Sequence, residues 1–184
     1  ASDWSSDVCS SDLTAYSGSG IQGVSGAETL WTMVGRMDHA AKVNYQTELD
    51  SITRALEQQG RSPSLLLHSC CGPCSSYVVT YLRQWFDITV LYFNPNIYPK
   101  EEYEHRLREQ ERLLEELGIP LIRGSYDHQD FLQAVRGLET EPEGGARCEQ
   151  CFRLRLRKTM ELAQREGFAY FATTLTVSPH KNAM

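Results

Sequence analysis

The sequence has 184 residues, of which 41% are hydrophobic and 23% are charged, and its formal net charge at pH 7 is −6. This length is enough for one domain with a buried core. The acidic balance argues against nucleic-acid binding by the whole surface and leaves room for a local basic patch. No apolar run approaches the roughly 20 residues that span a bilayer, and no charged-then-apolar leader opens the sequence. We therefore expect a cytoplasmic protein without a membrane partner.

The first 36 residues differ in composition from the remainder. They are rich in Ser, Gly and Asp, and the triplet Ser5-Ser6-Asp7 recurs as Ser10-Ser11-Asp12. Such low-complexity sequence lacks the apolar periodicity of a packed element. We interpret residues 1–36 as a disordered or non-native extension, exclude Cys9 from the site described below, and expect a single α/β domain over residues 37–184.

Apolar periodicity and turn residues predict alternating helices and strands after this segment. The expected helices cover residues 45–59, 75–85, 100–117, 128–136 and 152–166, and the expected strands cover residues 64–68, 88–93, 119–123 and 168–175. Strands that alternate with helices pair in parallel. We therefore predict an α/β fold with a doubly wound, mostly parallel sheet and helices on both faces, in which ligands bind beyond the carboxyl ends of the strands.

Cysteines gather at two places on that edge of the predicted sheet. Cys70, Cys71 and Cys74 follow the first strand and precede a helix, and Cys148 and Cys151 precede the helix expected from residue 152. A helix N-terminus favours thiolate over thiol. In a reducing compartment, clustered cysteines are more often metal ligands or redox groups than disulfides. The two groups therefore predict one shared site.

Three kinds of site fit these cysteines. The run Cys71-Gly72-Pro73-Cys74 matches the redox dithiol of thioredoxins. Four cysteines can also hold a structural zinc ion or an iron–sulfur cluster. ATP hydrolysis is not expected, because the loop after the first strand has neither a P-loop nor a G-x-G-x-x-G motif.

Further side chains have a functional and a structural interpretation. A basic run at a helix start either contacts RNA phosphates or is a solvated face, and aromatic residues at the edge of the sheet either stack on a base or belong to the core. His68 and His180 are either ligands or hydrogen-bonded structural residues, and Asp127 is either a hard oxygen ligand or a helix cap. The basic run comprises Arg153, Arg155, Arg157 and Lys158, and the aromatic residues are Tyr92, Tyr98 and Tyr126.

Four motifs carry a resemblance to a known family. They are His68-Ser69-Cys70-Cys71-Gly72-Pro73-Cys74, then Asn94-Pro95-Asn96-Ile97 with Glu102-Tyr103 and Arg106, then Arg147-Cys148-Glu149-Gln150-Cys151 with Arg153-Leu154, and Thr173-Thr174-Leu175 with Ser178-Pro179. In this order, over about residues 43–182, they resemble the cobalamin-independent epoxyqueuosine reductase of the QueH type.

The resemblance implies a reaction and its cofactors. It implies reduction of the epoxide of epoxyqueuosine in tRNA to queuosine, the last step of queuosine biosynthesis, with electrons from an unidentified donor. It also implies a Rossmann-like fold of the adenine nucleotide alpha-hydrolase-like kind and a [4Fe-4S] cluster on Cys70, Cys71, Cys148 and Cys151. A second, mononuclear iron is expected nearby, and we assign it to the catalytic residues Cys74 and Asp127. A thioredoxin-like oxidoreductase using Cys71 and Cys74, or a structural zinc domain, is the alternative.

One part of the family pattern is missing from this sequence. Members carry a closely spaced C-terminal cysteine pair, and the sequence ends at Met184 without it. We therefore expect residues 37–184 to be a reductase domain truncated at its C-terminus, which assembles the cluster but does not turn over.

Overall fold

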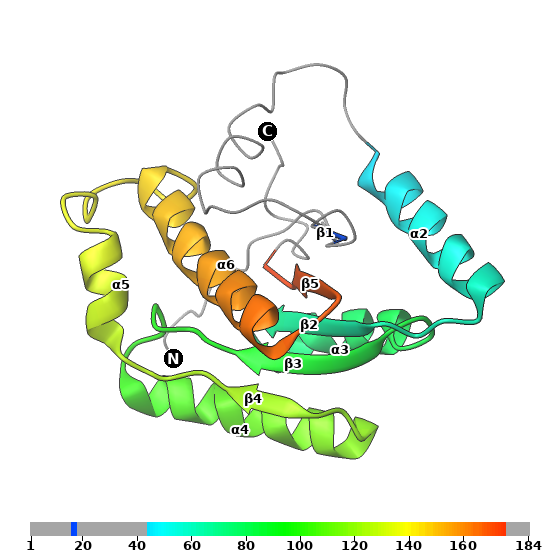
Figure 1. The fold of residues 1–184 in the computed structure, drawn as a ribbon. Helices are drawn as coiled ribbons and strands as arrows, with labels where there is room; N and C mark the ends of the chain where they lie inside the picture. Colours follow the sequence, from blue (N-terminus) through cyan, green and yellow to red (C-terminus); the bar gives the residue numbers. More distant parts are fainter. Residues whose placement is uncertain (1–15, 18–43, 176–184) are drawn as a thin grey trace.

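The computed structural model describes residues 16–17 and 44–175. Its elements alternate along the chain as the sequence predicts (Figure 1). The helices are α2 (Tyr45–Gln59), α3 (Gly72–Leu82), α4 (Lys100–Leu117), α5 (His128–Ala134) and α6 (Ala146–Glu166). The strands are β1 (Tyr16–Ser17), β2 (Ser64–Ser69), β3 (Asp87–Tyr92), β4 (Leu121–Arg123) and β5 (Tyr170–Thr173).

The strands form one sheet in the order β1-β5-β2-β3-β4. Strands β5, β2, β3 and β4 are parallel, and β1 pairs antiparallel with β5 through Tyr16 and Phe171. The predicted α/β fold with a mostly parallel sheet is confirmed. The remainder of residues 1–36 lies outside the described residues, so the interpretation of that segment stays a prediction.

Helices cover both faces of this sheet, as Figure 1 shows. Along β2, Leu65 and Leu67 face a cluster formed with α2, α3 and α4, whereas Leu66 packs on the opposite face against α6. All three leucines are at most 1% exposed, and burying one such side chain contributes about 2 kcal/mol. The continuous apolar run of the central strand thus reflects burial on two faces.

Two helices begin earlier than expected, and this changes the placement of the cysteines. Helix α3 begins at Gly72 rather than residue 75, because Pro73 suits the first turn of a helix. Helix α6 begins at Ala146 rather than residue 152. Its first two turns contain no helix breaker, and Glu149 pairs with Arg153 one turn on. Cys148 and Cys151 therefore lie within the helix and not before it.

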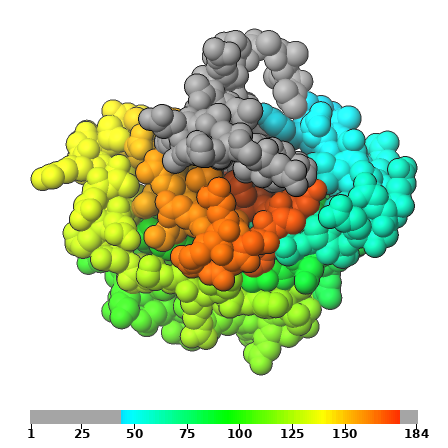
Figure 2. All heavy atoms as spheres, in the orientation of Figure 1, coloured from blue at the N-terminus to red at the C-terminus, as the bar shows by residue number. Residues whose placement is uncertain are grey.

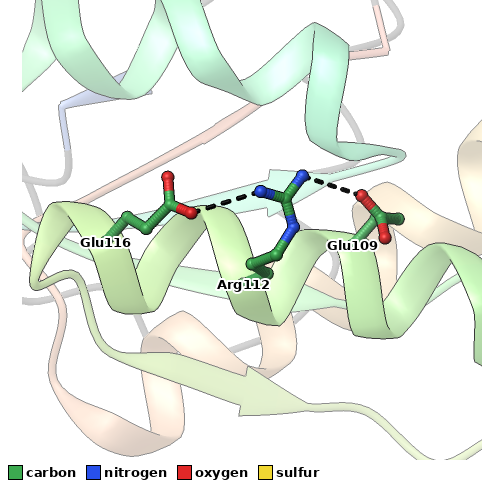
Figure 3. A network of polar contacts seen from close by, with 3 residues as sticks. All are labelled: Glu109, Arg112 and Glu116. Atoms are coloured by element: carbon green, nitrogen blue, oxygen red, sulfur yellow. Dashed lines mark hydrogen bonds and ion pairs between the residues drawn. The ribbon is translucent and has the colours of Figure 1, made fainter.

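The surface of the long helices is highly charged. On α4, Arg112 lies between Glu109 and Glu116, 3.0 and 3.2 Å from their carboxylates (Figure 3). In the space-filling view, α5 and α6 lie side by side over one face of the molecule (Figure 2). None of the helices in the described ranges is long and apolar enough to cross a membrane.

Candidate functional site

The turn between β2 and α3 brings three thiols together. The sulfur atoms of Cys70, Cys71 and Cys74 all lie within 4.8 Å of one another, and those of Cys70 and Cys71 are 3.8 Å apart. All five cysteines of the described part are free thiols. Cys71 caps α3 and Cys74 lies in its first turn. The first turn of the helix therefore places the Cys74 sulfur beside those of Cys70 and Cys71. This triad could bind a metal ion.

A cavity of about 270 Å³ opens beside this turn and is lined by cysteines from both sequence groups. Cys70 and Cys71 line it from the turn, and Cys148 and Cys151 line it from the first two turns of α6. The backbone N–H of Gly144 donates to the Cys148 sulfur at 3.3 Å. The four residues predicted to share a site therefore do face one cavity, whereas Cys74 belongs to the triad and does not line it.

The thiols of the triad ionise unequally. Hydrogen bonds from the Cys71 and Cys74 thiols hold the pKa of Cys70 well below its ordinary value, and the Thr174 hydroxyl donates to the same sulfur at 3.4 Å. For the same reason the pKa of Cys71 rises to about 11 and that of Cys74 is also raised. Because the three sulfurs lie so close together, the loss of a proton from one of them raises the pKa of the others.

Arg155 lies at this cavity and is buried, with only 5% of its surface exposed. Its guanidinium donates to the Asn94 side-chain oxygen at 3.4 Å and to the Cys151 carbonyl at 3.3 Å, and it lies over the Phe152 ring at 5.3 Å. Among the described residues, no carboxylate lies within 4.0 Å of it. The expectation that Arg155 lies on a solvated face is therefore wrong, because α6 turns this residue inward with Cys151. That it holds an RNA phosphate stays a prediction.

The uncompensated charge of Arg155 acts on its neighbours. Burial raises the pKa of Cys151, and the positive charge of Arg155 opposes that rise. Burial also lowers the pKa of His68 to about 4, with Arg155 adding to the effect. The cavity is consequently an environment that favours an anionic occupant.

His68 is a structural residue of the sheet. It is fully buried, and its Nε2 lies 3.0 Å from the Phe93 carbonyl, which can only accept. Nε2 therefore carries the proton, and Nδ1 accepts from the Thr173 hydroxyl at 3.0 Å. Since both ring nitrogens are engaged, the structural interpretation of His68 holds. His180 lies outside the described residues.

Asp127 caps a helix in this structure. Its carboxylate accepts from the backbone N–H of Gln129 at 2.9 Å at the start of α5. The side chain is exposed and does not line the cavity. The geometry brings Asp127 neither to the triad nor to the other cysteines, so its assignment to a metal has no support from position.

A buried polar layer supports the cysteine turn. The Ser69 hydroxyl donates to the Gln110 side-chain oxygen at 2.8 Å, and the Ser75 hydroxyl donates to the Cys71 carbonyl at 2.8 Å. The Asn94 side-chain nitrogen donates to the Ser69 carbonyl at 2.8 Å, and the Asn94 side-chain oxygen accepts a hydrogen bond from the Arg155 guanidinium. Asn94 thus links the cysteine turn to the buried charge, while the Gln110 side-chain nitrogen is buried without a partner in the described structure.

Three further lining residues were not assigned a role in the site from the sequence, although Asn96 belongs to one of the four motifs. Glu143 is the one carboxyl group among the described lining residues, and Phe131 and Asn96 lie on the same cavity. The oxygen of the Asn96 side chain is buried without a partner in the described structure. The sequence did indicate that Glu143 lies near the site, because its acidic, Gly-containing loop leads directly to Cys148. Whether the Glu143 side chain lines the cavity depends on how that loop packs.

Comparison with known proteins matches this site to one family. The family model of the epoxyqueuosine reductase QueH matches residues 65–184, a range that contains all five cysteines described above. The chain belongs to the epoxyqueuosine reductase QueH family. The resemblance inferred from the four motifs is confirmed, and QueH membership favours that interpretation over the thioredoxin-like and zinc alternatives.

Individual QueH proteins cover most of this chain. It is 40% identical over 160 residues to the epoxyqueuosine reductase QueH of Streptococcus pyogenes serotype M1, an alignment of 84% of this chain and 63% of that protein. The QueH of Staphylococcus epidermidis is 39% identical over 150 residues, and that of Haemophilus influenzae is 38% identical over 142 residues, with 77% of this chain covered in both cases. These alignments cover 63% and 58% of the two relatives. The chain thus spans less than two thirds of the length of these relatives.

Proposed function

We propose that this chain carries the catalytic centre of an epoxyqueuosine reductase, which removes the epoxide oxygen of epoxyqueuosine in tRNA and leaves queuosine. The observation that carries the proposal is the convergence of four thiols from two distant segments on one cavity beside a buried arginine. The names of the relatives supply the substrate.

The side chains around the cavity fit a [4Fe-4S] cluster. Such clusters are held by four cysteine thiolates, and Cys70, Cys71, Cys148 and Cys151 offer four sulfurs. A buried charge is costly unless an opposite charge compensates it, and Arg155 has no carboxylate partner among the described residues. An anionic cluster would provide that partner. For a second, mononuclear iron, the triad geometry supports Cys74 as a ligand, whereas the exposed cap Asp127 lacks such support.

The reaction consumes two electrons and two protons, because both carbon–oxygen bonds of the epoxide break and the oxygen leaves as water. The cluster, when bound, supplies electrons one at a time. Glu143 would give a proton to the departing oxygen, and this role is supported by its being the carboxyl group among the described lining residues. Neither His68 nor Tyr92 lines the cavity. Arg106 and Arg147, which do, would orient the substrate through its oxygens.

The partners follow from the same chemistry. The substrate is tRNA carrying epoxyqueuosine, and a separate one-electron donor renews the reducing equivalents. We place the protein in the cytoplasm, where tRNA is abundant and a reducing environment keeps five thiols free.

Conversion of an epoxyqueuosine-containing anticodon stem-loop tests this proposal. The protein is loaded anaerobically with iron and sulfide, reduced chemically, and the RNA is digested and analysed by mass spectrometry. The 184-residue chain and a version extended by the C-terminal part of the streptococcal relative are compared. We expect queuosine from the extended chain and none from its Cys148→Ser variant. Iron–sulfur loading without any queuosine from either chain would contradict the proposal.

A further inference from the structure

Three aromatic rings form a stack at the rim of the cavity. The rings of Tyr98 and His128 lie 4.9 Å apart at 29°, and those of His128 and Phe131 lie 5.5 Å apart at 33°. Phe131 lines the cavity. Tyr98 is the outermost member, and 70% of its surface is exposed. The stack therefore leads from the cavity to an open aromatic face.

Hydrogen bonds hold the loop that carries Tyr98 in place. The Nδ1 of His128 lies 2.7 Å from the Pro95 carbonyl, and the Tyr126 hydroxyl donates to the Ile97 carbonyl at 2.8 Å. At the start of the loop, Asn94 donates to the Ser69 carbonyl at 2.8 Å. The backbone on either side of Tyr98 is thus held before any ligand arrives, and the ring rests on His128, which reduces the entropy lost on binding.

We propose that the exposed face of Tyr98 stacks on an unpaired nucleobase of the substrate RNA, next to the nucleotide that enters the cavity. Single-stranded RNA is commonly recognised by stacking of bases on aromatic side chains. Tyr98 does not line the cavity itself, and two ring spacings separate it from Phe131. The base on Tyr98 is therefore a flanking base rather than the reacting one. This inference rests on the proposed function, because it takes the RNA as the ligand.

The chain contains a matched control for this proposal. Tyr77 on α3 is 68% exposed, and its ring stacks on Tyr81 at 5.9 Å. Tyr81 in turn contacts Trp85, and none of these three residues lines the cavity. Tyr77 and Tyr98 thus share residue type, exposure and stacking, and differ in their connection to the site. Substitutions at such exposed positions rarely change stability by more than about 0.5 kcal/mol.

The test uses anticodon stem-loops with epoxyqueuosine and with 2-aminopurine at either neighbouring loop position. Stacking quenches 2-aminopurine fluorescence, and fluorescence anisotropy gives the dissociation constant. We expect quenching at one position with wild-type protein and with Tyr98→Phe. Tyr98→Ala should abolish the quenching and weaken binding about 5- to 150-fold, whereas Tyr77→Ala should change neither.

The outcomes separate this inference from the proposed function. Wild-type affinity and quenching in Tyr98→Ala would overturn the stacking proposal and leave the reductase proposal intact. Equal losses in Tyr98→Ala and Tyr77→Ala would also overturn it, because a general surface effect would then explain both. Wild-type protein that binds no stem-loop would overturn both proposals together.

Discussion

Replacing Arg155 by Met should have opposite effects on two properties: the free energy of unfolding of the cluster-free protein, and the affinity of the site for an anionic cluster. The substitution keeps a long side chain and removes the charge. In the described structure Arg155 is 5% exposed, and its guanidinium has two neutral hydrogen-bond acceptors, the Asn94 side-chain oxygen and the Cys151 carbonyl. Replacing buried charge by apolar volume is often neutral or stabilising, by up to about 4 kcal/mol. We therefore expect the cluster-free Arg155→Met protein to unfold in urea at the same or a higher concentration than wild type.

In the protein loaded with a cluster, the same substitution should be unfavourable, because it weakens cluster binding. At an effective dielectric constant of about 20, a unit charge roughly 4–6 Å from a thiolate contributes about 3–4 kcal/mol. Loss of the Arg155 charge would therefore weaken an anionic cluster and make its reduction potential more negative, on the order of 100 mV for one electron. In the cluster-free protein, the loss of this charge would also raise the pKa of the Cys151 thiol further, because Arg155 opposes the effect of burial.

Three assays measure these changes. Urea unfolding reports on the cluster-free protein, spectroelectrochemistry on the loaded protein, and the pH dependence of Cys151 alkylation, followed by mass spectrometry, on the thiol. Arg155→Lys should stay close to wild type, and Arg153→Met is the control, because Arg153 is exposed and pairs with Glu149 on the same helix. Unchanged potential and unchanged Cys151 reactivity in Arg155→Met would refute the assigned role.

Two further substitutions test the proton donor and the support of the sheet. Glu143→Gln should slow conversion of bound epoxyqueuosine in a single turnover by about 10²- to 10⁴-fold without changing RNA affinity, and a wild-type rate would remove Glu143 from the reaction. His68→Leu leaves the Phe93 carbonyl and the Thr173 hydroxyl without their buried partner. At about 1–3 kcal/mol for each unsatisfied group, urea unfolding should show a loss of about 2–6 kcal/mol, whereas the exposed His105→Leu should show almost none.

The convergence of the cysteines could be predicted from sequence because topology dictates it. Parallel strands present their carboxyl ends at one edge, so the residues after β2 and those at the start of α6 meet there. The Asp127 cap also had a local signal, since Asp commonly precedes a helix start. The assignment of Asp127 to iron rested on its being a hard oxygen ligand that follows a strand, and no local signal separated that role from the cap.

The burial of Arg155 was missed for a specific reason. A helix expected from residue 152 separates the cysteine pair from Arg155, whereas the helix observed from Ala146 puts Cys148, Cys151 and Arg155 at positions i, i+3 and i+7 of one face. The amphipathic pattern was therefore present, but it was hidden by a boundary placed six residues too late. The orientation of the Glu143 side chain and the stacking of Tyr98 depend on how two loops pack. Hydrophobic periodicity in the sequence predicts helices and strands but not the packing of loops.

The iron and acid-labile sulfide content of anaerobically reconstituted protein tests the central claim most directly. The account predicts equal amounts of sulfide and cluster iron, corresponding to one [4Fe-4S] cluster per chain, with visible charge-transfer absorption that Cys148→Ser removes. Any second iron would appear as iron without matching sulfide and would depend on Cys74. Protein that instead retains zinc without sulfide, or that forms a Cys71–Cys74 disulfide and binds no iron, would contradict the account.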